Sequence, residues 1–296
     1  ASDVYKRQGE YQGRLDAIID GHSHTEENFT ENGVLIAQTG TGLKKLGKME
    51  ITPEADGSYA LTETLLTWSD TADVTPDPDV ADALETITSG QEEQLANRVC
   101  ETTNTLWGGY INNISVARIT ETNLGDLVTD AFRDAATDFI AGSQSQDLIP
   151  YKDVPVAAVE NGGGIRSSIP NGTTTKKELV TAFPFSNTLM LKAVTPQILF
   201  QVMEHSLSNV TAQDEETGML SGVYGGGFLQ VSGIQVRYNP NAPEDAKILE
   251  MKLDDGTVLS RDDTDTPMIL VSNNYIMSCL LYTSPSSRDG LLSRMP

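Results

Sequence analysis

The apolar residues of this chain occur in short runs that Gly, Pro or Asp residues interrupt, and this spacing limits what the chain can fold into. Clear runs are 34–38 (VLIAQ), 46–51 (LGKMEI), 59–66 (YALTETLL) and 154–159 (VPVAAV). Short apolar runs between turn-forming residues are typical of β-strands. None approaches the ~20 residues that a transmembrane helix needs. The pattern therefore predicts several β-strands and no transmembrane helix.

Three segments show helical spacing instead. Residues 80–99 follow a linker at 70–79 that is rich in Asp, Thr and Pro. Residues 124–139 place apolar side chains on one face after the cap candidates Thr122 and Asn123. A third helix is expected to begin at 195–196, where a cap residue precedes a proline. Further strands are expected at 14–19, 188–193, 233–238 and 267–271. Because helices and strands are mixed from residue 113 onward, residues 113–278 are predicted to form an α+β domain.

Charge restricts the class of ligand. The 296 residues include 42 acidic and 20 basic ones, for a formal net charge of −22, and 38% of the residues are hydrophobic, which suits packed cores. A surface of this charge repels polymeric nucleic acid and anionic membranes. A small phosphorylated ligand is still compatible, because a few arginines in a cleft set the local potential.

The two ends of the chain do not continue the patterns beside them. Residues 1–8 (ASDVYKRQ) and 279–296 (CLLYTSPSSRDGLLSRMP) resemble translated library-adapter sequence, so both are expected to be non-native tails; frayed natural termini are the alternative. Cys279 would then be non-native, and Cys100 and Cys279 are in any case too few for a disulfide framework. No signal-peptide pattern opens the chain, so either the protein is cytosolic or its true N-terminus is missing, and the tails favour the second explanation.

Two histidines follow the first predicted strand. His22 and His24 stand two residues apart in an extended loop, DGHSHT, where both imidazoles can point to one side. Imidazole is a common ligand of zinc and similar ions, and two-metal sites clamp phosphate esters. The alternative is a solvent-facing pair.

A glycine-rich turn follows the strand at 154–159. The segment 161–166 (NGGGIR) lets the backbone approach a ligand, and Arg166 offers paired donors to phosphate oxygens. It lacks the Gly-Lys-Ser/Thr ending of a Walker loop and the spacing of a dinucleotide fingerprint. The alternative is a plain turn with a surface arginine.

Aromatic residues at two strand ends could serve a base or the core. Phe185 (in PFSN) and Tyr275 (in NYI) each stand beside polar residues. Stacking on an aromatic ring contributes ~1 to 3 kcal/mol per base without demanding a particular base. Core filling is the alternative for each ring.

Two groups of these motifs resemble one family. IIDGHSHT followed by LGKMEI is similar to the last metal-binding motif of calcineurin-like metallophosphoesterases, specifically the 5′-nucleotidase family. Five further blocks resemble, in order, the C-terminal nucleotide-binding domain of the same family: ARITETNLGDLVTDAF, VENGGGIRSSIPNG, FPFSNTLMLKAVT, GGFLQVSGIQVRYNP and VSNNYIM.

The resemblance implies a fold and a set of site residues. Residues 9–69 would be the C-terminal part of an αββα metallophosphoesterase sandwich, 70–112 a linker and connecting helix, and 113–278 an α+β substrate-binding domain. His22 and His24 would be ligands of a centre of two divalent metal ions, zinc, manganese or similar. The implied contacts with substrate are Asn161 and Arg166 to phosphate or ribose, Phe185 and Tyr275 around the base, Asn187 to the base, and Arg118 to phosphate unless it is a surface arginine.

The implied activity is metal-dependent hydrolysis of nucleotide phosphoesters to nucleoside and phosphate, in an extracellular, cell-wall or periplasmic location. The family's Asp-x-His and Gly-Asn-His-Asp motifs, which carry catalysis, have no counterpart here, and Ser278-Cys279-Leu280 stands where a Gly-Gly-Asp-Gly segment is expected. This chain is therefore expected to bind nucleotides but to be inactive alone. The alternatives are a bifunctional 2′,3′-cyclic-nucleotide 2′-phosphodiesterase/3′-nucleotidase and a non-catalytic nucleotide-binding module.

Overall fold

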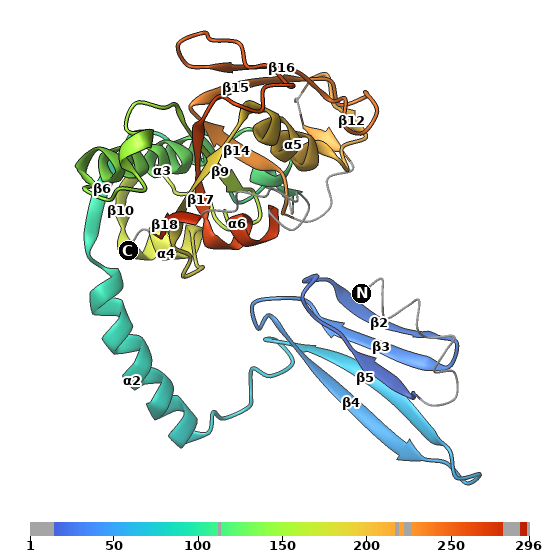
Figure 1. Cartoon of the computed structure of the whole chain (residues 1–296). Coiled ribbons are helices and arrows are strands. Elements are labelled where there is room, and N and C mark those ends of the chain that lie inside the picture. Colours follow the sequence, from blue (N-terminus) through green and yellow to red (C-terminus); the bar gives the residue numbers. More distant parts are fainter. Residues whose placement is uncertain (1–14, 112–113, 217–218, 222–225, 281–290, 295–296) are drawn as a thin grey trace. The chain divides into compact units, whose positions relative to one another are not determined.

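The computed structural model describes residues 15–111, 114–216, 219–221, 226–280 and 291–294. The chain divides into two compact units, residues 1–87 and 88–296 (Figure 1). The expected N-terminal tail at 1–8 lies outside the described residues, as does most of the expected tail at 279–296.

The described part of the first unit contains β1 to β5, and its last residues, 78–87, begin a helix. β1 (Ala17–Ile19), β3 (Val34–Thr39) and β2 (Glu26–Glu31) form a sheet in the order β1-β3-β2, with β1 parallel to β3. β4 (Lys45–Pro53) and β5 (Tyr59–Thr67) form an antiparallel hairpin. The strands predicted at 34–38, 46–51 and 59–66 are confirmed. The expectation that 14–19 is a buried strand is wrong for burial, because Ile19 in β1 is 82% exposed.

The helix α2 (Pro78–Leu95) is shorter than the predicted 80–99, and none of its residues is buried. The chain after it forms β6 (Arg98–Thr102), which pairs antiparallel with β10 (Gly172–Thr175). Val99 fits the helical spacing, but the pairing with a segment far along the chain places it in a strand.

The second unit has a central sheet in the order β14-β9-β17-β11-β18. β9 (Val156–Asn161) runs parallel to β17 (Met268–Asn273), and the other pairings are antiparallel. β14 (Leu229–Ser232) and β11 (Leu189–Val194) flank this parallel pair. β18 (Leu291–Arg294), from the expected C-terminal tail, pairs with β11 at the edge.

Helices cover both faces of this sheet. On one face α3 (Asn123–Gly142) packs Ala136 and Ile140 against Ala158, Leu191 and Ile269. On the other, α5 (Pro196–Leu207) contributes to a larger cluster. Figure 1 shows β9, β14 and β17 between these two helices. The predicted mixed α+β fold is confirmed, and no helix in the described part of the chain has both the length and the apolar character to cross a bilayer.

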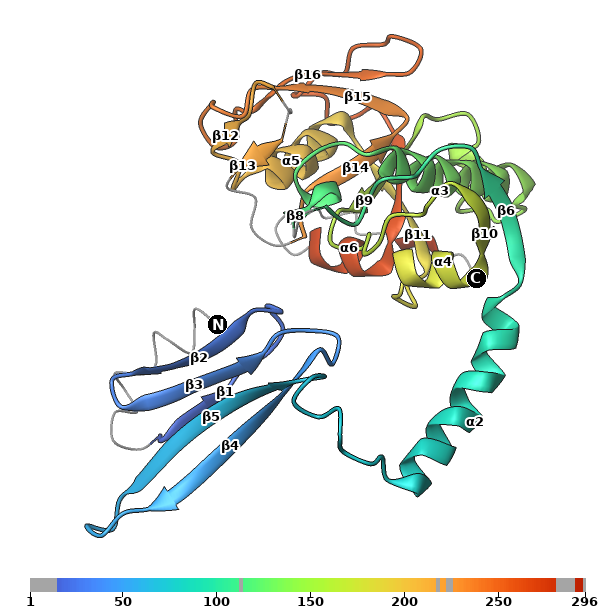
Figure 2. The same ribbon diagram turned by 180° about the vertical axis from the view of Figure 1, so that it is seen from behind.

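Shorter elements complete the second unit. α4 (Lys176–Ala182) and α6 (Asn274–Leu280) lie at the same end of the sheet in Figure 1 and Figure 2. Two short 3-10 helices span Val116–Arg118 and Ile149–Tyr151. The remaining strands form hairpins: β7 (Tyr110–Ile111) with β8 (Ile114–Ser115), β12 (Ala212–Gln213) with β13 (Leu220–Ser221), and β15 (Ile234–Tyr238) with β16 (Ile248–Leu253).

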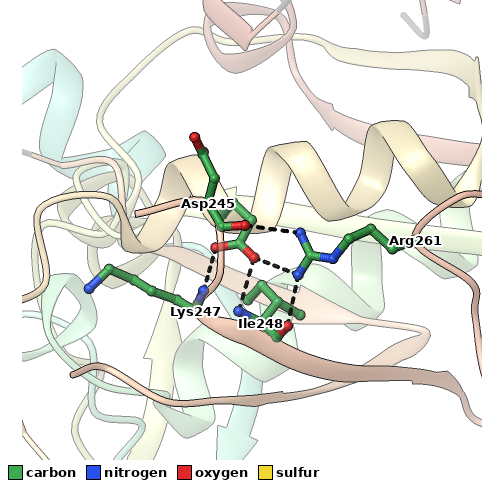
Figure 3. Close-up of polar contacts among 5 residues, drawn as sticks. Asp245, Lys247, Ile248 and Arg261 are labelled. Carbon is green, nitrogen blue, oxygen red and sulfur yellow. Dashed lines mark hydrogen bonds and ion pairs between the residues drawn. The ribbon is translucent and has the colours of Figure 1, made fainter. Parts of the chain in front are cut away.

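A buried glutamate in α5 ties this helix to the start of β16. Glu204 is 4% exposed, and its carboxylate accepts hydrogen bonds from the backbone N–H groups of Lys247 (2.9 Å) and Ile248 (3.0 Å). Arg261 Nη2 donates to Glu204 Oε1 at 2.6 Å and to the Ile248 carbonyl at 2.8 Å (Figure 3). The carboxylate thus satisfies three donors from two separate segments.

Candidate functional site

Polar side chains gather at one end of the central sheet of the second unit. β9 and β17 are parallel, so their carboxyl ends meet at the same edge, and β11 begins there because Leu189 pairs with Asn273. Asn161 ends β9 and Asn273 ends β17. Asn273 Nδ2 donates to Asn161 Oδ1 at 3.1 Å, which links the two strand ends directly.

The glycine-rich turn leaves β9 at this edge. The Gly162 N–H donates to the Phe228 carbonyl at 2.7 Å, and the Gly164 N–H donates to the Asn161 carbonyl at 2.8 Å. A Cβ atom at Gly162 would overlap the Ala117 carbonyl and crowd Arg118 Cα, so only glycine fits. This close approach brings Arg118 against the turn.

Arg118 ends the short helix Val116–Arg118 and carries an unsatisfied donor. Its Nε is buried and has no hydrogen-bond partner in the described part of the chain. The buried Gln230 fixes the segment around it, since Gln230 Nε2 donates to the Ala117 carbonyl (2.8 Å) and to the Thr120 carbonyl (2.9 Å). An unpaired buried guanidinium N–H is costly, and an anionic acceptor would remove that cost.

Arg166 is connected to the end of α4. Its backbone N–H donates to the Ala182 carbonyl at 2.8 Å, so the turn lies beside the segment that continues to Phe183 and Phe185. The Arg166 side chain is half-buried.

A pocket of about 250 Å³ lies on the α3 side of this sheet edge. Phe185 and Asn187 both line it, and Phe185 is 53% exposed. α3 supplies an apolar wall, and the strand ends supply polar groups. The other lining residues are Val128, Phe132, Glu160, Gly164, Phe183, Thr188, Leu189 and Asn273.

Glu160 is a member of this site that the sequence prediction missed. It is 4% exposed, and Asn273 Nδ2 donates to its Oε2 at 2.8 Å. Burial raises the pKa of Glu160 to about 7, and the hydrogen bond from Asn273 opposes that shift. The available signal was a carboxylate in an apolar strand directly before the glycine-rich turn, because a buried acid without a basic partner is unusual.

Tyr275 follows the lining residue Asn273 by two positions in the sequence, but it does not itself line the pocket. It stands in the first turn of α6 with 60% of its surface exposed. Its neighbour Asn274 is bound to the start of β11, since the Thr188 N–H donates to Asn274 Oδ1 at 2.8 Å. The structure therefore gathers Asn161, Arg166, Phe185, Asn187, Tyr275 and Arg118 around one sheet edge, with Phe185 and Asn187 in the pocket itself.

His22 and His24 belong to the first unit. Both are exposed, and their φ angles of 67° and 62° are left-handed, so the loop is not extended as predicted. The intervening Ser23 is held by Gln38, whose Nε2 lies 2.9 Å from Ser23 Oγ. Within the described ranges no three His, Cys, Asp or Glu side chains come together as a metal site. The described residues thus do not form a binuclear centre by themselves.

Comparisons with known proteins relate most of this chain to one family. Residues 99–278 match the family described as 5′-nucleotidase, C-terminal domain. A trifunctional nucleotide phosphoesterase protein of Bacillus subtilis (strain 168) is 27% identical over 272 residues, which are 88% of this chain and 16% of that protein. An endonuclease of the same strain is 25% identical over 264 residues, covering 88% of this chain and 18% of the endonuclease.

Solved structures share the fold. A 5′-nucleotidase precursor from Thermus thermophilus superposes with a TM-score of 0.58 at 24% identity, covering 94% of this chain and 55% of that structure. This chain therefore spans less than a fifth of the two Bacillus proteins and about half of the Thermus protein. On the match over residues 99–278, the chain belongs to the 5′-nucleotidase family and contains its C-terminal domain.

Proposed function

We propose that the second unit binds the substrate of a metal-dependent phosphohydrolase that releases nucleoside and phosphate from nucleotides. The observation that carries this proposal is the pocket lined by Phe185 and Asn187. It lies beside the glycine-rich turn, which contains Arg166 and contacts the segment of Arg118. An exposed ring offers a stacking surface for a base, and guanidinium groups bind phosphate oxygens. The two kinds of group lie at one sheet edge, as a molecule with a base and a phosphate requires.

Each site residue has a proposed role. Phe185 stacks on the base, Asn187 forms a hydrogen bond with it, and Tyr275 covers it from α6. Asn161 contacts the ribose or phosphate. Arg166 and Arg118 bind the phosphate through their guanidinium groups.

The metal centre is proposed to be shared with residues outside this chain. His22 and His24 would supply two ligands to a pair of divalent ions, zinc, manganese or similar, within the C-terminal part of an αββα sandwich at residues 9–69. Two imidazoles fall short of the ligands that two ions need, so the others would come from elsewhere. We further propose an extracellular, cell-wall or periplasmic location, in keeping with the resemblance to exported nucleotidases.

Small nucleotides suit this chain better than polymers. One relative is named an endonuclease, but the formal net charge of −22 disfavours a nucleic-acid chain. Cleavage of 2′,3′-cyclic nucleotides would use the same base and phosphate contacts. A non-catalytic nucleotide-binding module is favoured by one observation, namely that the described residues bring no three metal-ligand side chains together.

The proposal is tested by titration calorimetry of the full chain with adenosine and adenosine monophosphate. We expect saturable binding of both ligands. Phe185→Ala should weaken both by roughly tenfold or more, since stacking on one ring contributes ~1 to 3 kcal/mol. Arg118→Ala should weaken only the monophosphate, because adenosine has no phosphate to contact.

Arg98→Ala is the matched control, because Arg98 is an exposed arginine in β6 that pairs with Glu101 on the surface. It should leave both affinities unchanged. Absence of binding to the folded wild-type chain, or equal loss of both ligands in Arg118→Ala, would count against the proposed site.

A further inference from the structure

One wall of the pocket can change its charge. Among the described residues that line it, Glu160 alone carries an ionisable side chain. The aromatic rings of Phe183 and Phe185 and the apolar side chains of α3 line the same pocket. A ligand in this pocket would therefore lie beside Glu160 as well as Phe185.

The two oxygens of Glu160 have different surroundings. Oε2 accepts the hydrogen bond from Asn273, which also holds Asn161. Oε1 accepts no hydrogen bond from any described residue and lies against Gly164, where a Cβ atom would overlap it. The absence of a side chain at Gly164 leaves room for Oε1, and Glu160 and Gly164 both line the pocket.

We propose that Glu160 selects the base, through a hydrogen bond between its Oε1 and the edge of a nucleobase stacked on Phe185. This inference rests on the nucleotide-binding function proposed above. A protonated carboxyl donates through O–H to a ring nitrogen, as adenine presents. An ionised carboxylate accepts from a ring N–H, as guanine presents. Both bases carry an acceptor at N7, so the preference applies where Glu160 meets the N1 edge: there a neutral carboxyl suits the adenine acceptor and a charged one suits the guanine N–H.

Both forms occur near neutral pH. Burial raises the pKa of Glu160 to about 7, against the lowering effect of the Asn273 hydrogen bond. α3 turns Val128 and Phe132 toward the pocket, and no charged side chain of the packed elements is among the lining residues. Those outside the lining include Asp126 and Asp130 of α3, Arg166 of the turn, Glu178 of α4 and Lys192 of β11.

The test measures the affinities of the full chain for adenosine and guanosine by calorimetry at about pH 6 and about pH 8, on either side of the pKa. Nucleosides are used because the phosphate of a monophosphate itself titrates near pH 6. We expect the ratio of adenosine to guanosine affinity to fall roughly tenfold as the pH rises, the effect of exchanging one hydrogen bond. In Glu160→Gln, which has similar shape and no charge, the ratio should not change with pH.

Asp126→Asn is the matched control. Asp126 is a second carboxyl with a raised pKa, to about 6, and it lies outside the pocket lining. This variant should keep the pH-dependent ratio of the wild type. A Tm for Glu160→Gln at or above that of the wild type at pH 8 would show that the variant folds.

The outcomes separate the two proposals. A ratio independent of pH in the wild type, or one that Glu160→Gln leaves pH-dependent, would overturn the role of Glu160. If Phe185→Ala still weakened both nucleosides, the nucleotide-binding function would stand. No binding of either nucleoside to the wild type would overturn both.

Discussion

At the scale of single residues, the ionised form of Glu160 destabilises the folded chain, because the carboxylate is buried. A buried carboxyl without a basic partner resists ionisation, and burial raises the pKa of Glu160 from 4.5 to about 7. Between these two values the folded protein binds more protons than the unfolded chain. The contribution of this group to stability is therefore full below about pH 4.5 and is lost as the pH rises through about 7.

This reasoning predicts the pH dependence of the Glu160→Gln variant. Glutamine does not ionise, so the variant does not lose stability as the pH rises. The free energy of unfolding of Glu160→Gln minus that of the wild type should therefore rise by up to about 3 kcal/mol between pH 5 and pH 8. Urea denaturation of both proteins across this range measures the difference. A difference that stays constant with pH would mean that Glu160 does not titrate in this window. Asp126→Asn should change at lower pH and by less, since Asp126 is more exposed and its pKa is about 6.

At the scale of elements, two buried polar residues fix segments that lie far from them in the sequence. Gln230 in β14 holds the segment 117–122 that carries Arg118, accepting from the Thr122 N–H at 2.9 Å and donating to two carbonyls. Glu204 in α5 plays the same part for the start of β16. Each is buried, and each satisfies backbone groups that would otherwise be left unpaired.

Replacement of Glu204 should therefore be costly. Glu204→Ala leaves two buried backbone N–H groups without acceptors and Arg261 without its partner, and we expect a loss of about 3 kcal/mol in the free energy of unfolding. Denaturation in urea measures it. Glu250→Gln is the control, because Glu250 pairs with Arg237 and Lys252 on the surface and should cost much less. Equal losses in the two variants would contradict this account.

At the scale of the whole molecule, the candidate residues divide between the two units. The substrate contacts proposed here all lie in residues 88–296, and both histidines lie in residues 1–87. The described residues assemble one edge of polar and aromatic groups but no set of three metal-ligand side chains. The proposed substrate contacts and the proposed metal ligands therefore lie in different units.

The chain by itself should accordingly bind adenosine monophosphate without hydrolysing it. We expect no phosphate release above background when manganese is added, measured by a colorimetric phosphate assay. His22→Ala serves as the control, since it removes one proposed metal ligand while leaving the second unit intact. Release that manganese stimulates and that His22→Ala abolishes would show that the described histidines complete a working centre.

The sequence by itself determined the local elements and the family. Apolar runs and turn residues predicted strands such as β3, β5, β9 and β17, and Thr122 was predicted as a cap and accepts from the Gly125 N–H. These features depend on neighbours along the chain, which the sequence displays directly. The order of the motifs also pointed to the 5′-nucleotidase family.

The tertiary structure decided what depends on contacts between distant segments. Residues 98–102 became a strand because they pair with β10, although Val99 continues a helical spacing. The pKa of Glu160 is raised because the sheet and α3 bury its carboxyl. The Nε of Arg118 is buried without a partner among the described residues, where the segment 117–122 packs on the glycine-rich turn. No pattern along the chain encodes such contacts, because burial and pairing are properties of segments that only folding brings together.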